Sequence, residues 1–412
     1  MQSLPLFITK REIFSTFFLL AVLFSFSLLY QFYKYKQITT YSLHVTTAKV
    51  IKHYKKKSET GEIYTVLKLK NRDFIFYTAY WKPLEVDRND ELKVIFDTKK
   101  IDFYEYLKGF YASAKSLHVV KKNGENGLVD FVVNQHTDLT SQELYRALFF
   151  AIPISKELRE DINKWGIAHL VAISGFHLGI LSSILFFFFK YIYTFFQDKY
   201  FPYRNRMADL AFLVFVVLGC YIYFIDMPPS VVRAFVMSII GFLLFSRNIK
   251  IISFGTLSFT IVIVLIFFPN LLFSIAFWFS VMGVFYIFLF LYHFSNLNKV
   301  AIFILLNFWV YVLMLPVVHF VFDVFSFYQL FSPLISMLFI LFYPLSLALH
   351  VMNLGGSLDS FLIWFFSLHI EVYLITTPLW FFVSYLIVSL LAIRFRYIAF
   401  FLPIFSLSLF FI

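Results

Sequence analysis

Long apolar runs separated by short polar segments dominate the chain after residue 165, whereas an earlier stretch alternates apolar and polar positions. Runs of about 20 apolar residues can cross the hydrocarbon core of a bilayer as helices. Spans are predicted at 167–196, 208–225, 231–246, 251–268, 271–292, 300–321, 327–350 and 375–393, with weaker candidates at 360–374 and 397–412. The pattern is typical of a polytopic α-helical membrane protein, and residues 165–412 are predicted to form its multi-helix transmembrane domain.

The first apolar run, Ile13 to Tyr30, follows the basic pair Lys10-Arg11. It is too long and too aromatic for a signal peptide, and no small-residue cleavage site comes before Lys34. Residues 1–33 are therefore predicted to be an uncleaved signal-anchor helix. The basic pair before the run places the N-terminus in the cytoplasm, which puts the segment after the helix on the far side of the membrane.

Between residues 41 and 120, β-branched and aromatic residues alternate with Lys and Thr, and turn-like polar clusters interrupt them. The clearest strands are predicted at 43–46, 64–69, 74–77 and 92–96. Roughly five short strands at this spacing suit a small β-barrel such as an OB-fold. Residues 34–130 are therefore predicted to be an OB-like soluble domain inserted after the first transmembrane helix.

Residues 131–164 are amphipathic rather than uniformly apolar. Thr140 with Glu143 three residues later has the form of a capping box, and the charged segment 155–160 follows it. This part is predicted to be a linker with amphipathic helices at the membrane surface.

The composition supports the membrane prediction and excludes a soluble enzyme. Hydrophobic residues make up 60% of the chain and charged residues only 14%. The net charge is +11, and the chain has a single cysteine, Cys220. One cysteine excludes a disulfide framework, a CxxC redox pair and a cysteine-rich zinc site. The motif GxxxxGK[ST] is absent from the sequence, so no ATP-binding P-loop is predicted.

The densest chemical signal lies between Gly166 and Ile180, where His169, Ser174 and His177 interrupt an apolar run. Polar side chains in a membrane segment are costly unless they face a partner or water, so these three are candidates for a functional face of the bundle. Gly175 and Gly179 have the spacing that lets another helix approach closely. In the alternative interpretation, the glycines only pack and the histidines lie at interface depth with hydrogen-bonded rings.

The segment His-Leu-Val-Ala-Ile-Ser-Gly-Phe-His-Leu-Gly at 169–179 resembles the HLLAISGLHVG signature of the ComEC-type competence family. That family provides the inner-membrane channel for DNA uptake in naturally transformable bacteria. The similarity continues at 147–150, 157–159 and 165–167, at Pro-Ser-Val-Val-Arg-Ala (229–234), and at 269–284. It covers the chain from about residue 40 onward.

The chain also departs from that family. Ala151-Ile152 stands where members often have Gly-Asp, and the region 332–336 lacks the usual Asn. Many members carry a C-terminal metallo-β-lactamase-like domain, and we expect the short form without it. The histidines are scattered and no HxHxDH motif occurs, so no catalytic, metal-binding or cofactor-binding residue is predicted.

The resemblance implies that single-stranded DNA passes through the membrane domain from periplasm to cytoplasm. A path for phosphate needs donors and a few positive groups, and Arg233 is the strongest basic candidate. The alternative for Arg233 is a structural ion pair with Asp226. The candidates for the DNA path are His169, Ser174, His177 and Arg233.

The resemblance also implies that the soluble domain receives DNA in the periplasm. Lysines would contact phosphates and aromatic rings would stack on bases, although about half of the aromatic residues must point into the core because strand neighbours alternate faces. The candidates are Lys55, Lys56, Lys57, Tyr64, Phe76 and Trp81.

Two other classes stay open. A transporter or flippase for an anionic lipid or polymer would use the same buried Arg and histidines, and an intramembrane hydrolase could use Ser174 with His177. For the channel, the expected partners are single-stranded DNA, a periplasmic DNA receptor and a cytoplasmic ATP-driven translocase, with the lipid bilayer around it and an oligomer possible. The expected location is the bacterial inner membrane.

Overall fold

The structure is a computed structural model that describes residues 5–7, 9–57, 62–71, 73–81, 86–122 and 127–411, leaving the side chains of Lys55 and Pro229 outside the description. By its internal contacts the chain divides into two compact units. The first, here the sheet unit, comprises residues 11–131 and 262–274. The second, the helical unit, comprises residues 1–10, 132–261 and 275–412.

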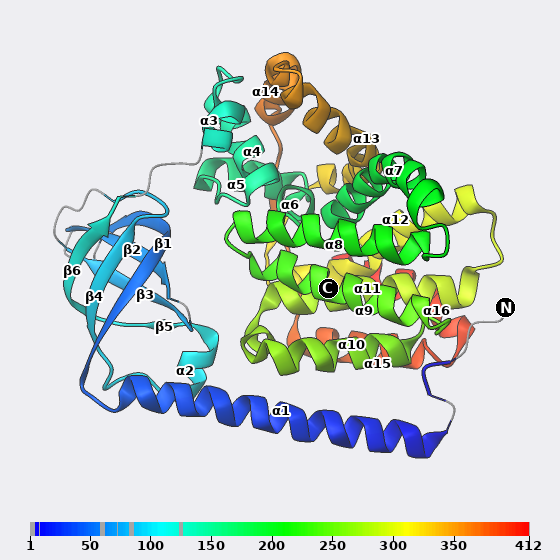
Figure 1. Ribbon diagram of the computed structural model, residues 1–412, viewed down its shortest axis with the longest axis horizontal. Helices are drawn as coiled ribbons and strands as arrows, with labels where there is room; N and C mark the ends of the chain where they lie inside the picture. The colour runs from blue at the N-terminus through cyan, green and yellow to red at the C-terminus, as the bar shows by residue number, and fades with distance from the viewer. Residues whose placement is uncertain are drawn as a thin grey trace. The chain divides into compact units, whose positions relative to one another are not determined.

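Helices make up most of the chain after residue 127 (Figure 1). The α-helices are α3 (Gly127–Val133), α4 (Leu139–Phe150), α5 (Lys156–Lys164), α6 (Ala168–Val171), α7 (Gly175–Tyr200), α8 (Arg206–Phe224), α9 (Pro229–Ser246), α10 (Phe254–Phe267), α11 (Ile275–Phe294), α12 (Lys299–His319), α13 (Ser332–Val351), α14 (Asp359–Ser367), α15 (Leu379–Leu391) and α16 (Arg396–Leu407). Short elements between and after them are η1 (Pro269–Phe273), β7 (Val324–Phe325), η2 (Phe327–Phe331), η3 (Gly355–Leu358), β8 (Tyr373–Leu374) and η4 (Ser408–Phe411).

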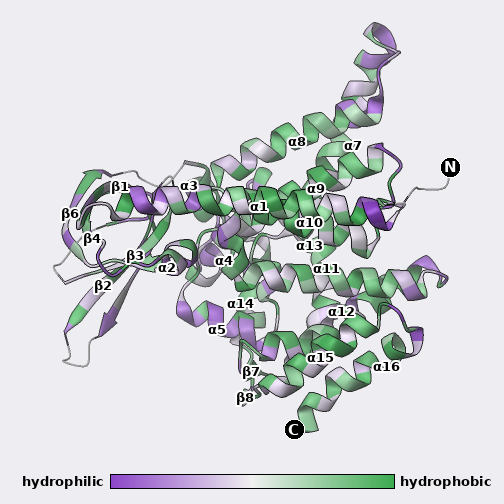
Figure 2. Cartoon of the chain, turned by 90° about the horizontal axis from the view of Figure 1, so that it is seen from below, coloured by the Kyte–Doolittle hydropathy of each residue, from purple (hydrophilic) through white to green (hydrophobic). Residues whose placement is uncertain are grey.

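Six helical segments among the described residues are long and apolar enough to cross a membrane. They are Lys10–Thr39, Gly175–Tyr200, Arg206–Phe224, Ile275–Phe294, Lys299–His319 and Phe327–Val351. Figure 2 shows the apolar colour running along helices such as α8, α9 and α11. Their hydrophobic side chains face outward as well as inward; Phe212 of α8, for example, is 71% exposed. A soluble protein could not leave so many large apolar side chains uncovered, so the chain is a multi-pass membrane protein.

The predicted weak span at 360–374 is wrong. Helix α14 has nine residues and so is only about 14 Å long at 1.5 Å per residue, which is less than half of a hydrocarbon core. The chain then runs into the two-residue strand β8, which pairs antiparallel with β7. The predicted continuous span at 167–196 also differs from the structure, because the chain is non-helical at 172–174 between α6 and α7.

The sheet unit begins with the 30-residue helix α1 (Lys10–Thr39). Six strands follow: β1 (Leu43–Lys57), β2 (Ile63–Lys70), β3 (Ile75–Tyr80), β4 (Glu91–Asp97), β5 (Phe110–Tyr111) and β6 (Ala114–Lys121), with the short helix α2 (Phe103–Lys108) before β5. The strand order is β5-β3-β2-β1-β4-β6, and β5 pairs parallel with β3 whereas the other neighbours are antiparallel. The sheet unit therefore contains a small mixed β-sheet.

A small OB-like β-barrel was predicted for this unit, and the structure corrects this in one respect: the barrel is not closed in the described residues. Strands β5 and β6 stand at opposite ends of the strand order and form no ladder with each other in the described part of the chain. The physical reason is the brevity of β5: its two residues pair with β3, and two residues later the chain joins the edge of β4. The sheet curves around its core, but among the described residues no ladder of hydrogen bonds joins β5 to β6.

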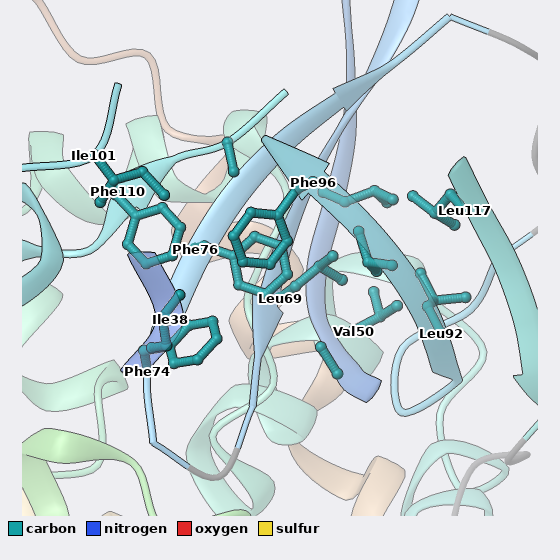
Figure 3. Close-up of a cluster of buried hydrophobic side chains, with 14 of the residues drawn as sticks. Ile38, Val50, Leu69, Phe74, Phe76, Leu92, Phe96, Ile101, Phe110 and Leu117 are labelled. Carbon is teal, nitrogen blue, oxygen red and sulfur yellow. The ribbon is translucent and has the colours of Figure 1, made fainter. Parts of the chain in front are cut away.

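Aromatic rings fill the core of the sheet unit. Figure 3 shows Phe74, Phe76, Phe96 and Phe110 pointing toward one another from β3, β4, β5 and the loop just before β3. Phe76 and Phe110 stack with centroids 5.7 Å apart, and Phe76 lies 5.0 Å from Phe96. Each ring buries a large apolar area without needing a polar partner, so this cluster stabilises the sheet without disulfide bonds.

The start of α4 differs from the predicted capping box at Thr140. The N-cap is Asp138, whose carboxylate accepts a hydrogen bond from the backbone N–H of Ser141 at 3.1 Å. The Glu143 carboxylate instead accepts the backbone N–H of Ser155 at 3.0 Å, just before α5. Glu143 therefore joins two consecutive helices rather than closing its own first turn.

Candidate functional site

The polar motif lies at a helix break in the helical unit. After α6 the backbone is extended at Ala172 and Ser174, and α7 starts at Gly175. The Ser174 hydroxyl accepts the N–H of Phe176 at 3.3 Å, and the N–H of Ser174 donates to Nδ1 of His177 at 3.3 Å. This is a capping box in which a histidine takes the place of the usual Glu or Gln.

The helix cap determines the tautomer of the neutral His177 ring. Nδ1 accepts the Ser174 N–H, so in the neutral ring the proton is on Nε2. His177 is fully buried, and its Nε2 has no hydrogen-bond partner among the described residues. The ring lies edge-on to Phe339 and Tyr343 of α13, with centroids 5.2 and 4.9 Å away. A buried donor of this kind is a feature that packing alone does not explain.

The Ser174 hydroxyl lies 3.2 Å from Nδ1 of His177, which is the distance a hydrolytic dyad would need. Both atoms are already engaged in the helix cap, and in the described part of the chain Nε2 meets no carboxylate that would orient the ring. The close contact is thus accounted for by local structure, and it gives no support to the hydrolase alternative.

His169 also contacts α13, but through Ser336 rather than through Phe339 and Tyr343. Its Nε2 lies 3.1 Å from the Ser336 hydroxyl, which in turn donates to the carbonyl of Ser332 at 2.8 Å. The Ser332 hydroxyl donates to the carbonyl of Gly166 at 3.0 Å. Ser336 therefore serves as a polar partner in the region where the family usually has an Asn.

Gly166 is required by both conformation and space. Its φ of +67° is in the left-handed region, and an added Cβ would lie 3.1 Å from Cγ of Gln329. The Gln329 amide donates to the carbonyl of Asn163 at 3.0 Å, just before this turn. The segment before α6 is thereby held against the start of α13.

Helix α9 packs on the same break. The Ser230 hydroxyl donates to the carbonyl of Ile173 at 3.1 Å. An added Cβ on Gly175 would lie 3.3 Å from Cβ of Ala234, so α7 and α9 approach closely there. A Cβ on Gly179 would meet nothing within 4 Å. The two segments that resemble the competence family, 169–179 and 229–234, are therefore in contact through Gly175 but not through Gly179.

Arg233 of α9 is only 5% exposed. Its guanidinium carbon lies 5.7 Å from the centroid of the Phe277 ring, and its Nε has no hydrogen-bond partner among the described residues. Arg233 takes part in none of the ion pairs that those residues form, so the alternative of an Arg233–Asp226 ion pair is not supported. A cation–π contact offsets only part of the cost of burying a guanidinium.

A second candidate surface lies on the sheet unit, where a bulge in β1 changes which side chains face outward. Val50 pairs with Leu69, and both are buried. The register shifts before Lys52, which pairs with Lys68. Without the extra residue Lys52 would share the core face with Val50, so the bulge turns the end of β1 outward.

The outward side of β1, β2 and β3 combines lysines with aromatic rings. This basic aromatic face consists of Lys52, Tyr54, Lys56, Tyr64, Lys68, Tyr77 and Trp81. The rings of Tyr64 and Trp81 lie 4.7 Å apart, and Trp81 is 55% exposed. The amino groups of Lys56 and Lys68 lie 6.0 Å from the Tyr54 ring and 5.4 Å from the Tyr77 ring, respectively.

The structure separates the predicted soluble-domain candidates. Tyr64, Trp81 and Lys56 lie on the basic aromatic face, and Lys57 is exposed at the end of β1. The side chain of Lys55 lies outside the described residues. Phe76 is fully buried in the aromatic core, so as a candidate for base stacking it is corrected: its ring has no face to offer.

One polar cluster was missed by reasoning from the sequence. His136, His350 and Asp359 are buried and hydrogen-bonded to one another, although more than 200 residues separate His136 from the other two. No local motif marks them, because only the packing of α4 against α13 and α14 brings them together. The described residues include no group of three or more His, Cys, Asp or Glu placed to hold a metal ion.

A family model described as "Competence protein" matches residues 152–411. This region includes the helix break before α7, Arg233 and all of α13. No curated protein and no solved structure matches the chain.

Proposed function

The chain belongs to the Competence protein family, which indicates a role in DNA uptake for competence, and from this premise we propose that it is the inner-membrane channel for the incoming strand. In this proposal single-stranded DNA passes from periplasm to cytoplasm through the helical unit during natural transformation. The sheet unit faces the periplasm, and the N-terminus is in the cytoplasm.

The observation that carries the proposal is the environment of Arg233. A guanidinium that is 5% exposed and joined to no carboxylate within the described chain is costly in a membrane-embedded bundle. A passing phosphate would supply the missing countercharge, and Arg is well suited to binding phosphate through two parallel hydrogen bonds. The Phe277 ring beneath it holds the guanidinium when no phosphate is present.

The helix break supports the same path. The first N–H groups of α7 lie at an interruption of a membrane segment, and helix N-termini favour anions. Irregular backbone at membrane depth is tolerated where it is buried in protein or lines a water-filled cavity, and transporters use broken helices of this kind to bind anionic groups. The close approach at Gly175 and Ala234 brings this N-terminus next to the turn of α9 that carries Arg233.

The basic aromatic face of the sheet unit would receive the strand. Stacking on Tyr64 and Trp81 does not depend on base identity, because every base has a π-face. Lys56 and Lys68 would neutralise neighbouring phosphates and make binding depend on salt. Such a surface suits uptake of DNA of any sequence.

The energy for transport has to come from a partner in this proposal. The sequence contains no P-loop motif, so a cytoplasmic ATP-driven translocase would pull the strand, and a periplasmic receptor would deliver it. Competence proteins are not known as an enzyme family, and we assign no reaction to this chain.

The test is uptake of labelled DNA by cells that lack this protein and are complemented with variants. Arg233→Ala should leave label in a nuclease-protected periplasmic pool and reduce cytoplasmic label by at least tenfold. Arg247→Ala is the matched control, because Arg247 is the exposed residue at the C-cap of the same helix, and it should transport normally. Unchanged cytoplasmic uptake in the deletion strain would overturn the proposal. Loss of lipid or polymer export in that strain would favour the transporter alternative, for which Arg233, joined to no carboxylate among the described residues, is equally suited.

A further inference from the structure

Three buried side chains in the helical unit form a continuous hydrogen-bonded chain that the proposed transport path does not use. Nδ1 of His136 lies 2.8 Å from the Asp359 carboxylate, and Nε2 of His136 lies 2.9 Å from Nε2 of His350. Nδ1 of His350 lies 2.6 Å from the carbonyl oxygen of Ser346. His136, His350 and Asp359 are 4%, 3% and 6% exposed, respectively.

The hydrogen-bond partners of these three side chains determine which of their nitrogens carry protons. The Ser346 carbonyl can only accept, so Nδ1 of His350 carries a proton, and in a neutral ring Nε2 of His350 then has a lone pair. An ionised Asp359 can only accept, so Nδ1 of His136 also carries a proton. If both rings were neutral, two lone pairs would face each other across 2.9 Å, a distance too short for a bridging water.

The geometry points to one additional proton, and we infer that His136, His350 and Asp359 form a buried proton-binding site. With the proton on Nε2 of His136, the ring is an imidazolium between the Asp359 carboxylate and the neutral His350. With the proton shifted so that Asp359 is protonated instead, His136 still donates to His350, and the total number of protons is the same. Either way the cluster is electrically neutral, which is the low-cost state for a buried group.

The surroundings favour a charged His136. The Tyr145 ring stacks on it with centroids 4.6 Å apart and an angle of 11°, so the π-face of the phenol lies against the imidazole. Tyr145 is the other titratable side chain packed against both histidines, since its centroid is 4.5 Å from that of His350. Burial, and then the nearby Asp359 carboxylate, raise the pKa of Tyr145 far above its ordinary value, so its hydroxyl stays protonated.

The site joins three separate parts of the helical unit. His136 precedes α4, His350 lies in the last turn of α13, and Asp359 begins α14. Gln135 reinforces the junction, because its amide donates to the carbonyl of His350 at 3.1 Å and accepts the N–H of Gly355 at 2.8 Å. Removing the proton would set two lone pairs against each other at this junction, so the attachment of α4 to α13 and α14 should weaken as the pH rises.

The direction of the pH effect on stability follows from the linkage between proton binding and folding. An ordinary histidine loses its proton near pH 6.5, whereas in the folded site the loss of the shared proton would set two lone pairs against each other across 2.9 Å. Above pH 6.5 the folded state then binds one more proton than the unfolded state, so stability falls as the pH rises. Below pH 6.5 the unfolded chain also protonates His350, which is neutral in the folded site, so stability is greatest near pH 6.5. Each further pH unit should lower the folded-to-unfolded ratio tenfold until the site itself releases the proton.

The experiment measures thermal unfolding of the full-length protein in lipid nanodiscs between pH 6 and pH 9. The wild type should lose stability with rising pH, and His136→Gln should remove that part of the slope. His118→Gln is the control, because His118 is an exposed histidine of the sheet unit that contacts Ser116. If wild type, His136→Gln and His118→Gln all show the same slope of stability against pH, the proton-binding site is overturned.

A second measurement tests the site even if His136→Gln does not fold. In wild-type protein labelled with ¹⁵N-histidine, one imidazolium signal should persist at pH 8, where ordinary histidines are neutral. His118→Gln should keep that signal, and its absence from the wild type would exclude the bound proton. Neither measurement involves DNA, so the proton site can fail while the channel proposal stands, and the reverse.

Discussion

The hydroxyl of Ser230 donates to the carbonyl oxygen of Ile173 at 3.1 Å, joining the first turn of α9 to the helix break before α7. Ile173 lies in the non-helical segment, so its carbonyl has no donor from a continuing helix. Backbone groups in a membrane domain must find partners inside the protein, since lipid offers none. Ser230 is therefore part of what makes the interrupted helix possible.

Ser230→Ala should destabilise the protein by about 1 kcal/mol, because a buried carbonyl loses its donor. Ser238→Ala is the control on the same helix: the Ser238 hydroxyl donates to the carbonyl of Phe235 within α9, so its loss leaves other elements untouched. Thermal unfolding in nanodiscs compares the two. A Ser238→Ala effect as large as that of Ser230→Ala would show that the bond to Ile173 contributes nothing specific.

The two glycines of the motif should respond oppositely to alanine. Gly179→Ala should stabilise the protein by up to about 1 kcal/mol, since alanine favours helix and the added Cβ meets nothing within 4 Å. Gly175→Ala places its Cβ 3.3 Å from Cβ of Ala234, so the gain should be cancelled or reversed as α7 and α9 are pushed apart. Unfolding midpoints of both variants measure the difference. Equal gains would mean that Gly175 does not set the helix approach.

The division into a helical part and a β part can be predicted from the sequence, because it follows from the composition and spacing of apolar residues. Apolar runs locate helices such as α8 and α12, and the alternating stretch locates a separate β unit. Sequence reasoning misplaces the boundaries that depend on a few local contacts. The interruption at 172–174 cannot be read from hydropathy, since Ala172 and Ile173 are as apolar as any helix residue.

The candidate sites show the same limit. Reasoning from residue type singled out Arg233, because a charge in an apolar run stands out, and Ser174 and His177, which the structure places in the cap of α7; a role of these residues in the DNA path stays a prediction. It could not find the pairing of His136 with His350, which lie 214 residues apart. It could also not tell the buried Phe76 from exposed rings, because alternation along β3 separates two faces without saying which of them covers the core.

Ala151 offers a test of backbone strain at a position where the family often has Gly. It is the C-cap of α4 and has φ 54° and ψ 30°, the left-handed conformation. A non-glycine residue there costs roughly 1–2 kcal/mol, so Ala151→Gly should stabilise the protein by about 1 kcal/mol once the extra freedom of the unfolded chain is subtracted. Ala147→Gly, inside the same helix, should destabilise it by a similar amount. Unfolding midpoints that move in the same direction for both variants would contradict the strain.

Substitutions in the sheet unit should separate DNA contact from core packing. Trp81→Ala removes the exposed ring, and Tyr64→Ala the half-buried ring, of a pair whose centroids are 4.7 Å apart. Either should weaken binding of single-stranded DNA by about 1–3 kcal/mol, and Trp81→Ala should change stability little. Phe76→Ala should instead cost about 3–5 kcal/mol of stability, because its ring is fully buried among Phe96 and Phe110. The measurement is fluorescence anisotropy of a labelled oligonucleotide with the full-length protein, at several salt concentrations.

The control for that experiment is Tyr41→Ala, which removes a ring that is 75% exposed but lies before β1 and outside the basic aromatic face. Lys56→Ala should weaken binding uniformly across sequences and reduce the salt dependence by about one phosphate contact, since lysine reads charge rather than bases. If Tyr41→Ala weakens binding as much as Trp81→Ala, DNA meets aromatic residues generally and the face has no special role. If no variant changes binding, the strand enters the protein elsewhere, and Arg233 would then be its first specific contact.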